Sequence, residues 1–188
     1  MTYAWTQQSG IPVTLSDPSA AKPTFTAPVV STNGDTLVFQ LTVTDSGQLF
    51  STATTRVTVV HQNPVCTAAE SKPSVLWPPN HNLIPVKILG VTDPDNRSTT
   101  IAVTAVTQDE PVKGLGDGDM SPDAVIQGQG VLLRAERSGT GNGRVYEVTF
   151  TATDSQGGTC NGKVKVSVPR DKQSSAIDNG QGTNSLLP

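Results

Sequence analysis

Apolar and polar residues alternate along much of this chain with a period of two, which is typical of β-strands that bury one face. Residues 36–44 are the clearest example, because one face is apolar and threonine or glutamine dominates the other. The apolar face consists of Leu37, Phe39, Leu41 and Val43, and Val38 is an apolar exception on the other face. No segment sustains the helical period of 3.6 residues. We therefore expect an all-β protein.

Residues 1–61 are predicted to form a first β-sandwich domain. Turn signals interrupt the alternating segments at 33–35 (Asn-Gly-Asp) and 45–47 (Asp-Ser-Gly), and these residue types suit tight turns. Prolines at both ends of residues 23–28 favour an extended chain there. The strands expected in this domain cover residues 3–7, 13–15, 36–44 and 53–60.

A second β-sandwich domain is predicted over residues 65–170, after a short proline-containing linker at residues 62–64. Roughly seven short strands, with turns about every 8–12 residues, are typical of an immunoglobulin-like sandwich. Residues 171–188 are polar and rich in Gly, Ser and Asn, which predicts a tail or linker. The strands expected in the second domain cover residues 74–76, 83–91, 99–108, 124–126, 131–137, 144–154 and 162–168.

The two domains end in similar sequences. Residues 41–60 read LTVTDSGQLFSTATTRVTVV, and residues 148–168 read VTFTATDSQGGTCNGKVKVSV. Each stretch contains an alternating strand, a Thr-Asp-Ser sequence, a turn and a last alternating strand. Such an internal repeat favours two related immunoglobulin-like domains in tandem.

The composition fits many short strands and gives no sign of a nucleic-acid or membrane function. The chain has 188 residues, with 17 glycines and 14 prolines, and its net charge is −3. A nucleic-acid surface would need clustered Lys and Arg, and no apolar run approaches the roughly 18 residues of a membrane span. We therefore expect no nucleic-acid partner and no membrane-spanning segment.

The two cysteines, Cys66 and Cys160, are too far apart in sequence for a CxxC zinc or redox site. In a strand-rich chain this pair predicts one structural disulfide, and two buried free thiols are the alternative. Closing a loop of this length stabilises a fold by about 4–5 kcal/mol if the effect is chain entropy. A disulfide also implies an oxidising compartment, so we expect an extracellular or cell-surface location.

Residues 3–60 carry the motifs of a known repeat family. They read YAWTQQSGIPVTLSDPSAAKPTFTAPVV at 3–30 and LVFQLTVTDSGQLFSTATTRVTVV at 37–60. These stretches resemble the PKD-type immunoglobulin-like repeats of bacterial secreted proteins. The resemblance implies that Trp5 lies in the core and that the domain is a spacer or adhesion module. Such domains have about 25–30 residues before the Tyr-x-Trp strand, so the first domain is expected to lack its N-terminal strands.

Residues 65–169 carry a second set of motifs. The stretches SVLWPPNHNLIPVKI at 74–88 and DEPVKGLGDGDMSPD at 109–123 are the most distinctive. They resemble the hyalin-type (HYR) immunoglobulin-like repeats of bacterial extracellular proteins. The resemblance implies an architecture and a location, and it carries no particular chemistry.

An acidic, glycine-containing loop at residues 109–123 is a candidate calcium site, because calcium takes about six to eight oxygen ligands. A second acidic turn follows residue 92. The spacing does not fit an EF-hand, since Pro122 and Gly128 fill the positions that would need Gly and Glu. The candidate ligands are Glu110, Asp117, Asp119, Asp123, Asp93 and Asp95.

Two alternatives to calcium stay open for these acidic residues. The aspartates can cap their own backbone in ordinary turns. Arg134, Arg137 and Arg144 lie near the adjacent glycine-rich hairpin and can pair with the acidic loop, although exposed pairs contribute only about 0–1 kcal/mol. We expect these arginines to lie on a solvated hairpin face.

Trp77 precedes two prolines in a turn and is a candidate to bind a sugar or a protein ligand. The alternative is a tryptophan that packs over the edge of the sandwich. Only 4% of the residues are aromatic, so a flat platform for sugar stacking is not expected.

The sequence predicts a non-catalytic structural or adhesive module of a bacterial secreted or cell-surface protein, with other domains of the same polypeptide as partners. It contains no Gly-x-Ser-x-Gly or His-Glu-x-x-His motif, so we expect no enzyme activity. One alternative is a carbohydrate-binding accessory module of a secreted hydrolase. Another is a self-assembling subunit that uses strand addition, with residues 174–188 as the donor.

Overall fold

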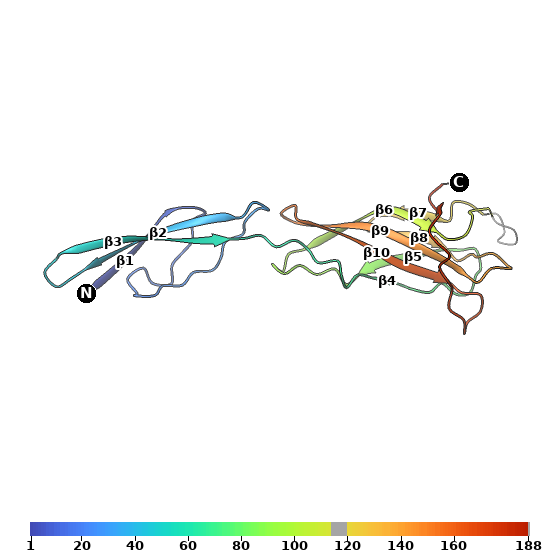
Figure 1. Cartoon of the computed structure of the whole chain (residues 1–188), viewed down its shortest axis with the longest axis horizontal. Coiled ribbons are helices and arrows are strands. Elements are labelled where there is room, and N and C mark those ends of the chain that lie inside the picture. The colour runs from blue at the N-terminus through green and yellow to red at the C-terminus, as the bar shows by residue number, and fades with distance from the viewer. Residues whose placement is uncertain (114–119, 188) are drawn as a thin grey trace. The chain divides into compact units, whose positions relative to one another are not determined.

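The computed structural model describes residues 1–113 and 120–187, and the chain divides into two compact units, Met1–Gln62 and Asn63–Pro188. All regular elements in the described residues are β-strands (Figure 1). The prediction of an all-β chain is confirmed, and the described residues fall into two units. Among the described residues, no helix is long and apolar enough to cross a membrane.

Unit 1 contains one antiparallel sheet in the order β1-β2-β3. Its strands are β1 (Thr2–Ser9), β2 (Asp35–Thr44) and β3 (Phe50–Val59). β2 pairs with β3 without interruption, whereas its pairing with β1 shifts between Gln7 and Ser9. The burial expected for the apolar face of β2 is seen at Leu37 and Phe39, which are both buried.

Residues 10–34 form no strand, so the strand predicted at 13–15 is absent, and residues 23–28, which were predicted to be extended, do not join the sheet. The Pro18 carbonyl accepts a hydrogen bond from the Trp5 amide of β1 at 2.8 Å, but other backbone groups of this segment bond within it or to side chains. One example is the 2.8 Å bond from the Ser16 amide to the Thr24 carbonyl. Extended conformation alone therefore did not make these residues part of a sheet.

Two aromatic contacts attach this irregular segment to the sheet of unit 1. Phe25 packs on Phe39 of β2 with ring centroids 5.3 Å apart. Trp5 of β1 is half-buried, and its indole N–H donates to the Ala20 carbonyl at 3.1 Å. The core of unit 1 thus lies between a single sheet and an irregular segment.

Unit 2 contains two antiparallel sheets, in the orders β10-β9-β6-β11 and β4-β5-β8-β7. Apolar side chains from both sheets form one core, as in a β-sandwich. The strands are β4 (Glu70–Lys72), β5 (Leu83–Leu89), β6 (Thr99–Gln108), β7 (Ala124–Gln127), β8 (Gly130–Arg134), β9 (Arg144–Asp154), β10 (Thr159–Val168) and β11 (Thr183–Asn184).

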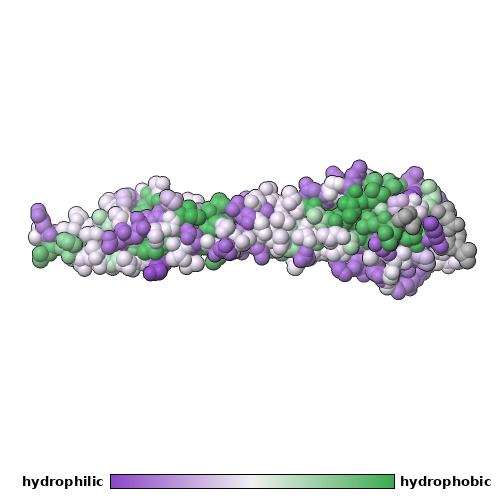
Figure 2. Space-filling view, turned by 90° about the horizontal axis from the view of Figure 1, so that it is seen from above, coloured by the Kyte–Doolittle hydropathy of each residue, from purple (hydrophilic) through white to green (hydrophobic). Residues whose placement is uncertain are grey.

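Some apolar area of unit 2 reaches the surface (Figure 2). Val125 and Ile126 of the short strand β7 are among its exposed apolar residues. A groove of about 370 Å³ lies between β5 and the start of β6, lined by Ile88, Leu89 and Ile101. The sandwich is therefore less completely closed at this edge.

Unit 2 differs from the sequence prediction at its first strands. The strand predicted at 74–76 is only an isolated parallel bridge between Val75 and Ser167. The preceding residues form β4, a three-residue strand that the alternation pattern could not reveal because it is so short.

Residues 171–187 pack on unit 2 and are not the free tail or linker that their polar composition predicted. β11 pairs with the end of β6. The next residue, Ser185, donates to the Val106 carbonyl at 3.0 Å and accepts from the Ala124 amide at 2.9 Å, so it joins one edge of each sheet. Leu186 packs against the core. One apolar side chain and a series of polar contacts are enough to order this segment.

Candidate functional site

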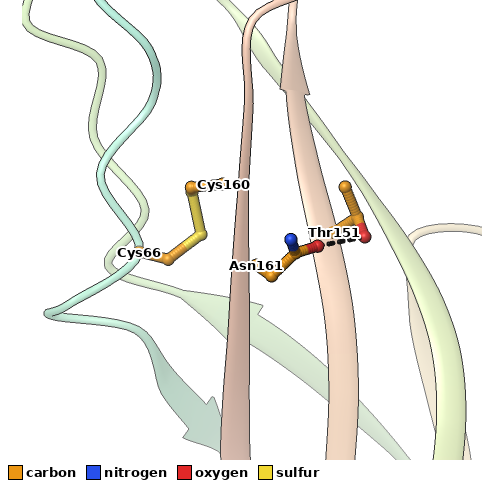
Figure 3. The surroundings of a disulfide bond; sticks show 4 residues. All are labelled: Cys66, Thr151, Cys160 and Asn161. Carbon is orange, nitrogen blue, oxygen red and sulfur yellow. Dashed lines mark hydrogen bonds between the residues drawn. A yellow bond between two sulfur atoms is a disulfide. The ribbon is translucent and has the colours of Figure 1, made fainter.

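The predicted disulfide joins the first residues of unit 2 to β10 (Figure 3). Cys66 and Cys160 are bonded, with their Cα atoms 5.9 Å apart and a sequence separation of 94. Gly162 makes this approach possible, because a Cβ on that residue would lie 2.5 Å from the Phe150 ring and 3.3 Å from the Cys66 Cβ. The prediction of a structural disulfide is confirmed.

β10 runs beside β9 from the disulfide to the far end of the sheet. Its pairing with β9 is regular from Cys160, opposite Ala152, to Val168, opposite Arg144. The segment that enters unit 2 is therefore covalently attached to one end of a long strand. The segment that follows residue 168 leaves from the other end of the same strand.

A buried arginine, Arg144, lies at that far end of β9. Its side chain is fully buried. Its Nε atom is 3.1 Å from Glu110 Oε2, and its Nη1 atom is 2.8 Å from Asp123 Oδ2. The same Nη1 atom is 3.2 Å from the Tyr146 hydroxyl and 3.8 Å from Glu136 Oε1. Three carboxylates thus surround one guanidinium group inside the protein.

A second layer of polar groups completes this cluster. Arg134 donates to the His81 carbonyl at 2.9 Å and lies 3.6 Å from Asp123 Oδ1. Gln108 donates to the other oxygen of Asp123 at 2.7 Å. The His81 Nδ1 atom is 2.9 Å from Glu136 Oε2. These contacts tie the loops after β6 and β8 to β9.

The cluster is electrostatically suited to holding fixed charges. Burial alone would lower the pKa of Arg144, but Tyr146, Asp123 and Glu110 raise it above its ordinary value. Burial raises the pKa of Tyr146 above its ordinary range. Both groups therefore keep their charge state near neutral pH, which fits a structural role for this pair.

The prediction that the three arginines lie on a solvated hairpin face is wrong. Arg144 and Arg134 are buried. Arg137 is half-buried and donates to the carbonyls of Pro169 and Arg170 at 3.2 and 2.9 Å. The charges are buried because each guanidinium group finds several acceptors, which offsets the cost of removing it from water.

The structure places two of the predicted calcium ligands in this arginine cluster. Glu110 and Asp123 bond to Arg144, which leaves less negative charge for a cation. Asp117 and Asp119 lie outside the described residues. Among the residues described, no group of three or more His, Cys, Asp or Glu side chains is arranged to hold a metal ion.

The second acidic turn caps its own backbone. Asp93 accepts hydrogen bonds from the amides of Asp95 and Arg97 at 2.8 and 3.2 Å. The Asp95 carboxylate lies 3.7 Å from the Arg97 guanidinium. This is the arrangement expected of an ordinary turn.

Trp77 borders a separate groove of about 250 Å³ on unit 2. Its side chain is 42% exposed, and Leu76, Pro78 and Ile84 are among the other lining residues. Leu76 is buried in the core, so the tryptophan packs at the edge of the sandwich and also presents one face to solvent.

Sequence reasoning named Arg134, Arg144, Glu110 and Asp123 but missed the other members of the buried cluster. Glu136, Tyr146 and Gln108 were not singled out, although all three are fully buried polar residues. The available signal was that Glu136 and Arg144 stand at the two ends of the glycine-rich hairpin with opposite charges. Their burial depends on long-range packing, which a local pattern does not reveal.

Comparison with known proteins supports the assignment of the first unit. Residues 1–59 match the family model described as "K319L-like, PKD domain". The chain is also similar to the crystal structure of the protocadherin GammaB4 extracellular domain, with 15% sequence identity and a TM-score of 0.30 over 87% of this chain and 27% of that chain. This chain thus spans about a quarter of that protein's length, and the similarity is too low to bear on function. No curated protein sequence matches the chain.

Residues 1–59 therefore form a PKD-like domain. The match covers residues 1–59 only, and domains of this type are typically non-catalytic modules of the structural or adhesion type.

Proposed function

We propose that this chain is a structural spacer of a secreted or cell-surface protein, and that its second unit transmits tension through the disulfide and β10. The observation that carries the proposal is the bond between Cys66, at the entry to unit 2, and Cys160, at the start of β10. Unit 1 precedes that entry in the chain, so a pull on unit 1 reaches Cys66 first.

The force then follows the shortest covalent path. From Cys66 it crosses the disulfide to Cys160 and continues along β10 to Val168. A β-strand already rises about 3.2–3.4 Å per residue, close to the limit of about 3.3–3.6 Å for a stretched chain. β10 can therefore lengthen very little, and residues 67–159 carry no tension while the disulfide is intact.

We expect the contacts outside this path to open first. Before the disulfide, an isolated bridge between Val65 and Thr92 connects the chain to the rest of unit 2. After β10, the pull acts on the segment that ends in β11 and Ser185. The core between the two sheets is shielded because most of its residues lie inside the covalent loop.

Single-molecule stretching of the whole chain tests this proposal. The wild-type protein under oxidising conditions is compared with the double variant Cys66→Ser/Cys160→Ser, and unit 1 serves as an internal control because it is the same in both. We expect the variant to release about 300 Å more chain, at about 3.3–3.6 Å per residue for the 94-position loop. Equal released lengths would exclude the tension path.

The expected location and partners follow from the same features. A disulfide that closes a long loop persists in oxidising compartments, and the PKD-like match favours a secreted or surface protein. The partners in this proposal are other domains of the same polypeptide and a protein ligand at the cell surface. A bacterial origin and an HYR-like second unit are part of the proposal on sequence resemblance alone.

Calcium binding at the acidic loop, predicted from the sequence, is disfavoured by the pairing of two candidate ligands with Arg144. Because Glu110 and Asp123 already pair with Arg144, we expect calcium and chelator to give the same melting temperature for unit 2. A rise in melting temperature with calcium that is lost in Asp123→Asn would instead support the site.

A carbohydrate-binding role is the second candidate, and the exposed face of Trp77 beside its groove is the observation that favours it. Glycan-array binding that disappears in Trp77→Ala would support this role. Absence of binding by the wild-type chain would remove it.

A further inference from the structure

The outer edge of β3 in unit 1 is a long, unprotected sheet edge. β3 pairs with β2 on one side, and no hydrogen bond in the described residues involves its other side. It runs for ten residues without a bulge or a proline, and Arg56 is its one charged residue. Edges of this kind are templates for another strand, and proteins usually blunt them with charges, prolines or bulges.

The other edge strands in the described parts of the chain carry such protection. β10 carries Lys163 and Lys165, and its Ser167 bonds to Ser74 and Leu76 on the side away from β9. β1 has an irregularity at Gln7 and Ser9, and the Trp5 amide bonds to the Pro18 carbonyl of the covering segment. β4 and β7 are only three and four residues long. The open part of β6 has a bulge after Val103, and the Gln129 side chain caps the Ile101 amide.

An apolar groove lies beside the unprotected edge. It measures about 260 Å³ and is lined by Trp5, Phe25 and Phe39 together with Thr55 and Val57 of β3. Apolar area is also visible on the surface of unit 1 in Figure 2. A free edge next to a pocket for side chains is the arrangement by which proteins accept an added strand.

We propose that this edge binds β3 of a second copy of the chain, antiparallel and centred on Thr55. A two-fold axis perpendicular to the sheet relates the copies. A residue that lies n positions before Thr55 in one copy therefore pairs with the residue n positions after Thr55 in the other copy. The side chains that face the groove then lie on the same side of the sheet in both copies. The two sheets of unit 1 thereby form one continuous sheet across the dimer.

This register pairs the exposed apolar residues of β3 with one another. Phe50 of β3 and Val60, which directly follows β3, are 72% and 64% exposed in the single chain. Phe50 of one copy lies opposite Val60 of the partner subunit. Val57, which lines the groove, comes opposite Ala53 of the partner subunit. Arg56 comes opposite Thr54 of the partner subunit, so no like charges meet. These matches favour a second copy over an unrelated partner.

The expected dimer is weak. A single pair of edge strands lies at the small end of protein interfaces, where association is transient. The C-terminal segment, predicted from the sequence as a strand donor, is not part of this proposal, because β11 already pairs with β6 of its own chain. The proposal therefore places the self-association in unit 1, and it is independent of the tension path in unit 2.

Two variants at one exposed position test the register. Thr54→Glu places a carboxylate opposite Arg56 of the partner subunit, twice per dimer, whereas Thr54→Lys places a like charge there. Thr54 pairs with the uncharged Gln40 within the chain, so the two variants differ in intermolecular charge far more than in strand packing. Their sedimentation is measured on the full chain from micromolar to millimolar concentration.

We expect the wild type to dimerise at the upper end of this range. Thr54→Glu should lower the dissociation constant by between about twofold and about thirtyfold, and Thr54→Lys should raise it by a similar factor. The double variant Thr54→Lys/Arg56→Glu should restore association. A wild type that stays monomeric at every concentration, or a dimer that responds equally to Glu and Lys, would overturn the proposal.

Discussion

Arg144 shows how a charge can be held inside a small β-sandwich. Three carboxylates and one phenol surround its guanidinium group within 4 Å. A buried ion pair of this kind adds little net stability when compared with well-packed apolar residues, but it is costly to break from one side. Its clearest effect is to fix the loops that supply Glu110, Asp123 and Glu136 against β9.

Replacing Arg144 with methionine should destabilise unit 2 by about 3–5 kcal/mol, because it leaves the buried carboxylates without their cation. Chemical denaturation followed by spectroscopy measures the change. Arg170→Met is the matched control, since Arg170 is exposed and should change stability by less than about 0.5 kcal/mol. Equal effects of the two variants would contradict the role assigned to the cluster.

Asp178 links the C-terminal segment to β10 and predicts a dependence on pH. Hydrogen bonds from Lys165, the Gly180 amide and Gln181 lower the pKa of Asp178 from 3.8 to about 2. A lowered carboxyl pKa stabilises the fold above the ordinary value and loses that effect as the pH falls through the folded value. We expect Asp178→Asn to cost about 1 kcal/mol or less at neutral pH, because Lys165 is exposed.

The stability difference between the wild type and Asp178→Asn should shrink as the pH falls from about 4 to about 2. Acid unfolding of the two proteins in parallel provides the measurement. A difference that stays constant across this range would show that the contact with Lys165 does not stabilise the segment.

At the scale of elements, β10 depends on a glycine next to the disulfide. A side chain at Gly162 would collide with the Phe150 ring and crowd Cys66. We expect Gly162→Ala to destabilise unit 2 by about 1–3 kcal/mol. Gly182→Ala is the control, because no atom lies within 4 Å of the Cβ position there. A loss of stability in the control alone would contradict this reading of β10.

Strands with a strong alternating pattern could be predicted from the sequence, and those without one could not. β2, β6 and β9 lie at their expected positions because their buried faces repeat every two residues. Residues 23–28 also looked extended, but they find no strand to pair with. β11 is two residues long, and its place depends on the edge of β6, which is remote in sequence.

Among the candidate sites, the disulfide was predicted correctly and the buried charge cluster was not, because only the disulfide can be recognised without knowing how the strands pair. The cysteine pair could be recognised because few other roles fit two distant cysteines in a strand-rich chain. The acidic residues near the loop were recognised as a group and pairing with the nearby arginines was considered, but the burial of these pairs was not predicted. Glu110 and Asp123 face buried arginines because β9 brings Arg144 to them, and only the register of the sheet determines that arrangement.

At the scale of the whole molecule, we propose that a covalent path bypasses the core of unit 2. Tension that enters at residue 63 would leave along β10, and we expect the fold to tolerate a pull that its hydrogen bonds alone would not withstand. Unit 1 has no cysteine and so no covalent bypass of this kind. Its extension is expected to be the same under oxidising and reducing conditions.

The most direct test holds the chain at constant force and then adds a reductant. The account predicts that unit 1 extends first, that the oxidised unit 2 then stays short, and that reduction produces one further step of about 300 Å as the 94-position loop is released. If unit 2 reaches its full length before the reductant is added, or if reduction produces no step, the central claim is contradicted.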